Sequence, residues 1–394
     1  MRPSLRRSSL CAAIALAVVP MAALSTAAWA AKPPPPSPPV PFEAGPGEFQ
    51  ARVVSEGDRN RVLNDMEIGA RAFWDGDYAT AKPALDDAIM RIGTVFADDP
   101  NAANARKLWY DEGSKDFKGE PYERAMAFLY RGLIYLHDGD YENARAAFRQ
   151  GQLQDAFAEE QQNRTDFALL MFLDAWASHL NGDTDLRDTA LQELSKFRSN
   201  FPGIGKKDDT LILAETGFSP RKLGDGADHA FFVYRRGKNN LENQVAVLRD
   251  GAPTPLYPME DIYYQASTRG GRQIDRILQG KAEFKATTGA IGSVVADTSV
   301  AISEQYGASN ATLIAGGVAG VFLIVSSNAK PAADTRYWSS LPDTVHVMTL
   351  ATGGKPPAMT ARFLKDGVEI PAEDKAIRCD VDSEHHTLCL VRAH

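Results

Sequence analysis

An internal repeat between residues 60 and 200 restricts the fold of this chain more than any other feature. The tetrapeptide Asp-Gly-Asp-Tyr occurs twice, at residues 75–78 and 138–141, each time between stretches with apolar residues at three- and four-residue steps. That spacing is typical of amphipathic helices, and the glycine between them predicts a turn. A weaker third copy centres on Gly182, with Trp176 before it and Ala190 after it. The segment is therefore expected to fold as paired helices.

The two clearer copies resemble the tetratricopeptide repeat, a helix-turn-helix unit whose small residues allow two helices to approach closely. The resemblance implies that the signature residues form the seam inside each helix pair, and that stacked pairs build a concave surface. The predicted seam residues are Gly76, Tyr78, Ala81, Gly132, Tyr135, Gly139, Tyr141, Ala144 and Phe148. Exposed residues between the seam positions would bind the partner. The residues expected to contact a protein or peptide partner are Arg124, Tyr130, Arg131, Asn143 and Gln150.

A change of pattern after Pro202 predicts a second, β-rich region. Short runs of β-forming residues begin there, at 210–214 among others. Two Asp-Gly pairs between apolar runs, the second at 366–367, predict hairpins because glycine accepts the positive φ of a tight turn. The predicted fold class is α+β, with a TPR-like helical domain at residues 59–202 and a β-rich module at 203–394.

The β-rich module contains an apolar insert at about residues 272–328. Residues 313–325 are continuously apolar, with Gly316 and Gly320 spaced for close helix contact. This run is shorter than the roughly 20 residues that span a bilayer. Three interpretations stand: a buried helical hairpin, which is favoured, contact with a membrane through residues 308–329, or a contact between copies of the chain.

Residues 1–30 are typical of an export signal rather than of a folded segment. A basic start precedes an apolar stretch, and Ala-Trp-Ala at its end predicts cleavage between Ala30 and Ala31. A retained membrane anchor is the weaker alternative, because the apolar run is short and broken at Pro20. The proline-rich stretch that follows predicts a semi-rigid linker over residues 31–58. The protein is therefore expected to be exported, to the periplasm or the outer envelope.

Removal of the signal leaves two cysteines, Cys379 and Cys389. A turn at Glu384 would place them directly opposite each other on adjacent strands, which predicts a disulfide in an oxidising compartment. Two free buried thiols are the alternative. A zinc site is disfavoured, because neighbouring His385 and His386 would point to opposite faces of a strand. We predict no metal and no cofactor.

Four segments carry a wider resemblance: Lys118–Ala125, Gly139–Arg145, Gly217–Lys222 and Ala333–Trp338. Through them residues 60–394 resemble a family of exported bacterial proteins of undefined biochemical activity, several of which look like lipoproteins. This chain departs from them in lacking a lipobox cysteine, and the resemblance implies no catalytic residues. The net charge of −8, from 51 acidic and 43 basic residues, makes nucleic acid a poor partner. We therefore predict a non-enzymatic scaffold of the cell envelope, with its oligomeric state left open.

An envelope hydrolase or acyl transferase is the alternative function. Ser219 and Lys222, followed by Ser-Ser-Asn at 326–328 and Thr-Gly at 352–353, follow the motif order of penicillin-binding proteins. That chemistry needs the serine and the lysine on one helical turn, so that the amine can reach the hydroxyl. Ala351 stands where the third motif would have its lysine. The scaffold is therefore the favoured function.

Overall fold

The computed structural model describes residues 44–93, 116–156, 165–225, 231–238, 240–249, 252–267, 334–370 and 374–394. The predicted signal peptide with its cleavage between Ala30 and Ala31 lies outside these ranges. The apolar insert at 272–328, including the segment 308–329, also lies outside them. No helix in the described ranges combines the length and the apolar content that crossing a membrane requires.

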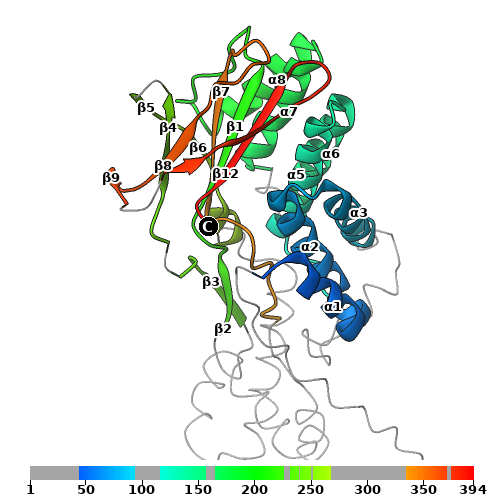
Figure 1. The fold of residues 1–394 in the computed structure, drawn as a ribbon. Helices are drawn as coiled ribbons and strands as arrows, with labels where there is room; N and C mark the ends of the chain where they lie inside the picture. The colour runs from blue at the N-terminus through cyan, green and yellow to red at the C-terminus, as the bar shows by residue number, and fades with distance from the viewer. Residues whose placement is uncertain are drawn as a thin grey trace, which may run out of the picture. The chain divides into compact units, whose positions relative to one another are not determined.

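Seven α-helices and one 3₁₀ helix occupy the described part of the N-terminal half (Figure 1). They are α1 (Pro46–Glu56), η1 (Gly57–Asn60), α2 (Arg61–Asp75), α3 (Tyr78–Gly93), α5 (Pro121–His137), α6 (Tyr141–Ala156), α7 (Ala168–Leu180) and α8 (Thr184–Ser195). The sequence predicted a linker up to residue 58, but the chain is helical from Pro46 onwards, so this part of the prediction is wrong. Proline suits the first position of a helix, and Phe49 one turn later is buried, with the Arg71 guanidinium 4.8 Å from its ring centre.

The helices pack in consecutive pairs, α2 with α3, α5 with α6 and α7 with α8. Each pair is joined by a short turn that contains one glycine in the left-handed region: Gly76 (φ 77°), Gly139 (φ 74°) and Gly182 (φ 79°). A side chain at these positions would clash with its own backbone, so the glycines allow each chain reversal. The weak third copy in the sequence therefore has the same turn geometry as the two clear ones.

Inside two of the pairs, a glycine on the first helix receives a large side chain from the second. A Cβ atom at Gly132 would lie 2.3 Å from Phe148 Cε1, and one at Gly69 would lie 2.5 Å from Leu85 Cγ. Ala81 and Ala144 of the second helices are fully buried. The small residues thus let the helices approach closely enough for Phe148 and Leu85 to fill the seam.

The C-terminal half consists mainly of strands. They are β1 (Thr210–Thr216), β2 (Arg221–Asp225), β3 (Phe231–Arg235), β4 (Gln244–Arg249), β5 (Ala252–Pro255), β6 (Tyr257–Asp261), β7 (Thr344–Leu350), β8 (Thr360–Lys365), β9 (Val368–Glu369), β10 (Lys375–Ala376), β11 (Arg378–Val381) and β12 (Thr387–Arg392), with the short helix α9 (Ile262–Ser267) after β6. The first sheet has the order β11-β12-β1-β7-β6, and the second has the order β10-β8-β4-β5 with β9 paired to β8. Strands β2 and β3 form a separate hairpin. The prediction of a mixed α+β protein, with helices before strands, is confirmed.

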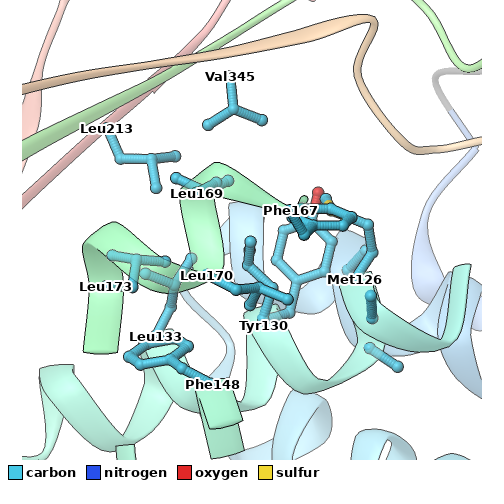
Figure 2. Packing of buried hydrophobic residues seen from close by; sticks show 14 of the residues in the cluster. Met126, Tyr130, Leu133, Phe148, Phe167, Leu169, Leu170, Leu173, Leu213 and Val345 are labelled. Carbon is cyan, nitrogen blue, oxygen red and sulfur yellow. The ribbon is translucent and has the colours of Figure 1, made fainter. Parts of the chain in front are cut away.

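The central strand β1 of the first sheet is buried on both faces. In β1, Leu211 and Leu213 belong to the core shared with the helices, whereas Ile212 and Ala214 belong to the core shared with the second sheet. Figure 2 shows Leu213 and Val345 above the side chains of α5, α6 and α7. Because strand residues alternate between faces, an uninterrupted apolar strand suits this central layer. The boundary predicted at residue 202 is thus a change of secondary structure within one packed unit.

Strands β11 and β12 form the C-terminal hairpin, which carries the two cysteines. The antiparallel register places Cys379 opposite Cys389, and their sulfur atoms are bonded at 2.03 Å. The predicted pairing of these cysteines is confirmed. The hairpins predicted at the two Asp-Gly pairs are also present, as β4–β5 and β8–β9.

Candidate functional site

The five residues expected to contact a partner do not share one surface. Asn143 and Gln150 are exposed on α6, whereas Arg124 is half-buried, with its guanidinium donating to the Gln154 side chain and the Gly119 carbonyl. Tyr130 is fully buried and Arg131 is 9% exposed. The prediction that Tyr130 and Arg131 are exposed is therefore wrong.

Tyr130 is buried because the first sheet covers its face of α5. Its hydroxyl donates to Glu215 Oε1 of β1 at 2.7 Å, and its ring lies 5.7 Å from that of Trp338. Figure 2 shows Tyr130 among Met126, Phe167 and Leu170. The face expected to form a concave docking surface is thus packed against the protein's own sheet.

Arg131 is held between the helix pairs. Its Nε donates to Asp86 Oδ1 of α3 at 2.7 Å, and its guanidinium carbon lies 3.8 Å from the ring centre of Tyr135. An arginine that is this buried and also ion-paired joins α5 to α3. Its role in this position is internal support of the array.

An open groove lies instead between α6, α7 and α8, with a volume of about 210 Å³. Arg145 and Arg149 of α6 lie over it and form ion pairs with Asp174 of α7, at 3.2 and 3.8 Å. Burial raises the pKa of Asp174, although both arginines oppose the shift. Leu186 on the α8 side is 39% exposed, and Leu153, one turn beyond Arg149, is 47% exposed. Exposed apolar side chains beside fixed charges are typical of a protein-binding surface.

Three of the segments that carry the wider resemblance meet in one buried polar cluster. Lys222 Nζ donates to Glu120 Oε1 at 2.6 Å, although 102 residues separate them. Glu123, at the start of α5, accepts the backbone N–H groups of Glu120 and Trp338, each at 2.7 Å. Ser219 Oγ donates to the Trp338 carbonyl at 2.7 Å. The sequence contained these residues, but nothing in it indicated that they would lie together.

This cluster contains Ser219 and Lys222, the two residues on which the alternative hydrolase or acyl transferase function rests. Residues Arg221–Asp225 form strand β2 and not the helical turn which that chemistry requires. Although burial lowers it, the charges of Glu120, Asp334 and Glu123 raise the pKa of Lys222 overall, so the amine stays protonated. Ser219 and Lys222 thus each have a different partner. Residues 326–328 lie outside the described ranges, and Thr352 binds Asp209 through its N–H and hydroxyl.

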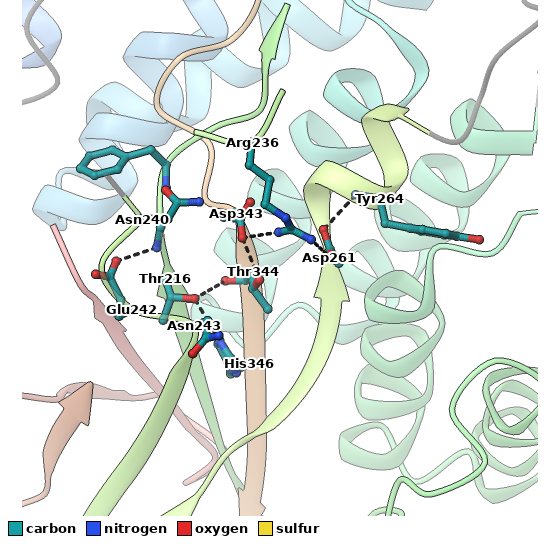
Figure 3. Close-up of polar contacts among 12 residues, drawn as sticks. Thr216, Arg236, Asn240, Glu242, Asn243, Asp261, Tyr264, Asp343, Thr344 and His346 are labelled. Atoms are coloured by element: carbon teal, nitrogen blue, oxygen red, sulfur yellow. Dashed lines mark hydrogen bonds and ion pairs between the residues drawn. The ribbon is translucent and has the colours of Figure 1, made fainter. Parts of the chain in front are cut away.

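A second polar cluster lies where β1 ends and β7 begins, in a cleft of about 460 Å³ (Figure 3). Figure 3 shows Arg236, just after β3, between Asp343 and Asp261, with both ion pairs at 2.5 Å. The guanidinium binds both carboxylates and joins β3 to the β6–β7 edge. These three residues are far apart in the sequence, and no motif pointed to them.

His346 lies in the same region, on the sheet face opposite the helices. Its Nε2 is 3.0 Å from Thr216 Oγ1, and burial lowers its pKa to about 4 (Figure 3). The imidazole is therefore neutral at ordinary pH, which suits a buried hydrogen-bonding role. In the described part of the chain, no group of three or more His, Cys, Asp or Glu side chains is arranged to hold a metal ion.

Searches against protein-family models, curated proteins and solved structures find no significant match.

Proposed function

We propose that this protein is a non-enzymatic, exported scaffold of the cell envelope, which holds a protein or peptide partner on the outer face of its helices. Helix pairs with interlocked glycine seams and glycine turns support a TPR-like array. The export signal expected in residues 1–30 and the Cys379–Cys389 disulfide support an oxidising compartment.

The observation that carries the proposal is the groove between α6, α7 and α8. The opposite face of the array is packed on the sheet, so among the described helices the face left open to a partner is the outer one. The groove combines Arg149, whose side chain is 60% exposed, with the exposed Leu186. The exposed Leu153 lies one helical turn beyond Arg149, outside the groove lining. We define the α6–α8 face as Asn143, Arg149, Gln150, Leu153, Leu186 and Thr189, all exposed. Two of the five residues expected from the sequence, Asn143 and Gln150, belong to it.

Site-specific photo-crosslinking in cells that produce the full chain tests the proposal. A photoreactive residue at Gln150 or Thr189 is expected to yield the same adduct of discrete mass. The same residue at Val368, which is 69% exposed in β9, serves as the control and is expected to yield none. Equal adducts at all three positions, or none at Gln150 and Thr189, would contradict the proposal.

A charge reversal then tests the groove itself. Arg149→Glu is expected to lower the adduct yield at Gln150 by about tenfold, the effect of losing one interfacial contact worth about 1.4 kcal/mol. Lys355→Glu makes the same charge change at an exposed position outside the α6–α8 face, and is expected to leave the yield unchanged. Equal yields from the two variants would show that the groove does not hold the partner.

A further inference from the structure

A cleft of about 460 Å³ lies where the C-terminal end of α2 meets strands β10, β11 and β12. We call it the basic cleft and define it by Arg71, Trp74, Lys375, Arg378, Arg392 and His394. Its volume lies within the range of pockets that bind small molecules. It is separate from the α6–α8 face and plays no part in the function proposed above.

The charged side chains that line this cleft are mostly of one sign. Three arginines and Lys375 line it, against one acidic residue, Asp75. Arg71 also pairs with Glu67 at 3.3 Å and His394 with Glu242 at 2.6 Å, and neither glutamate lines the cleft. The whole chain has a net charge of −8, so such a concentration of positive charge runs against its composition. A concave surface lined by one sign of charge attracts ligands of the opposite sign.

Several of these cations have backbone carbonyls as their hydrogen-bond partners. Arg378 donates to the carbonyls of Trp74 and Phe73 at 2.9 and 3.3 Å, and Lys375 donates to the Ala393 carbonyl at 2.7 Å. A carbonyl accepts a hydrogen bond but carries no net charge, so the positive charge of each donor persists. Arg378 also forms an ion pair with Asp380, at 3.5 Å from its Nε.

The buried acid beside Arg392 is Glu215 of β1. Glu215 Oε2 lies 3.4 Å from Arg392, and burial raises the pKa of Glu215 to about 7. Burial thus favours the neutral form of this carboxyl. Burial and the positive charge of Arg392 lower the pKa of Lys375, although the charge of Glu242 opposes the shift. A bound anion would relieve this repulsion.

Trp74 supplies a flat apolar wall. Its ring centre lies 5.1 Å from the Arg392 guanidinium carbon, so aromatic and cationic groups lie side by side. We propose that the basic cleft binds a small molecule that carries at least two oxyanionic groups, such as phosphates or carboxylates. Arginine and lysine side chains bind both kinds of oxyanion, so the two share one recognition chemistry.

Isothermal titration of the purified full chain with inorganic pyrophosphate and with citrate tests this site. Both titrations are run at matched ionic strength against sodium chloride. We expect saturable binding of at least one anion, with one site per chain. The anion that binds with the higher affinity shows whether the cleft prefers a phosphate-type or a carboxylate-type ligand. Absence of saturable binding of either anion would overturn the proposal.

Variants then locate the binding. Lys375→Gln removes one cation of the cleft at an exposed position and is expected to weaken binding about tenfold, as for the loss of one charged hydrogen bond. Lys355→Gln removes the same charge at an exposed residue that does not line the cleft, and is expected to leave the affinity unchanged. Equal affinities in the two variants would overturn the assignment. Thermal melting of both variants confirms that each is folded.

Discussion

A single glycine, Gly132, determines how closely α5 and α6 approach. Its missing side chain leaves the space that Phe148 occupies, and a Cβ atom there would lie 2.3 Å from the Phe148 ring. Gly132→Ala is expected to lower the free energy of unfolding by about 1–3 kcal/mol, because an overpacked seam must shift or force Phe148 off its rotamer. Urea denaturation measures this loss.

Substitution of Phe148, the residue that fills this space, tests the explanation. In a Phe148→Ala background the space is vacant, so the additional loss from Gly132→Ala should disappear. Gly47→Ala is the matched control, since a Cβ atom there meets nothing within 4 Å in α1. If Gly132→Ala costs as much with Phe148 absent as with it present, the seam does not depend on this contact.

The C-terminal hairpin, β11 with β12, binds the turns of the first two helix pairs. The Tyr78 hydroxyl donates to Asp380 at 3.2 Å, and the Tyr141 hydroxyl contacts both Asp382 and His386 at 2.5 Å. Tyr78 and Tyr141 are the last residues of the two Asp-Gly-Asp-Tyr copies. The sequence predicted them to lie in the helix seams, and their hydroxyls in addition contact the hairpin. Each also attaches a helix pair to the hairpin that contains the disulfide.

Removal of one hydroxyl tests this attachment. Tyr141→Phe is expected to lower the free energy of unfolding by about 1.5–3 kcal/mol, the range for hydrogen bonds to charged groups. It should also speed thiol reduction of the Cys379–Cys389 bond, because the hairpin opens more often. Tyr263→Phe, at a half-buried tyrosine of α9 whose ring lies 4.7 Å from the Arg236 guanidinium, keeps that ring contact and should do neither. Equal reduction rates in the two variants would rule out the attachment.

Three buried glutamates join the helices to the sheet layer. Glu123 of α5 binds the Trp338 N–H, Glu215 of β1 binds Tyr130, and Glu260 of β6 accepts the Leu169 N–H at the start of α7. Burial raises the pKa of Glu123 and Glu215 to about 7 and that of Glu260 to about 8. Each folded-state pKa lies above the ordinary value of 4.5. Between these values the folded protein holds more protons than the unfolded chain.

The stability of the whole molecule should therefore fall as the pH rises from about 5 to 8, by up to about 1.4 kcal/mol per pH unit for each group. Glu260→Gln should flatten the upper part of this window, near pH 8, because Glu260 has the highest pKa of the three. Glu369→Gln, at an exposed residue of β9, should leave the slope unchanged. Urea midpoints measured from pH 5 to 9 test this prediction. Parallel plots of the midpoint against pH for the two variants would contradict it.

Local patterns predicted much of the fold. The three- and four-residue apolar spacing marked the helices around Gly76 and Gly139, and the ten-residue separation of Cys379 and Cys389 marked a hairpin. The site was predicted less well. Asn143 and Gln150 are on an exposed helix face, but Tyr130 and Arg131 have the same helical periodicity and are buried.

The sequence by itself determined where helices, turns and hairpins form, since these depend on residues a few positions apart and on the conformations that glycine alone accepts easily. Only the tertiary structure decided which helix face stays open. Strand β1 pairs in parallel with β12, almost 180 residues later, and the resulting sheet covers the face of α5 that includes Tyr130. The same long-range packing brought Lys222 to Glu120 and Arg236 to Asp343. Contacts of this kind depend on which distant surfaces exclude water together, and no short stretch of sequence encodes them.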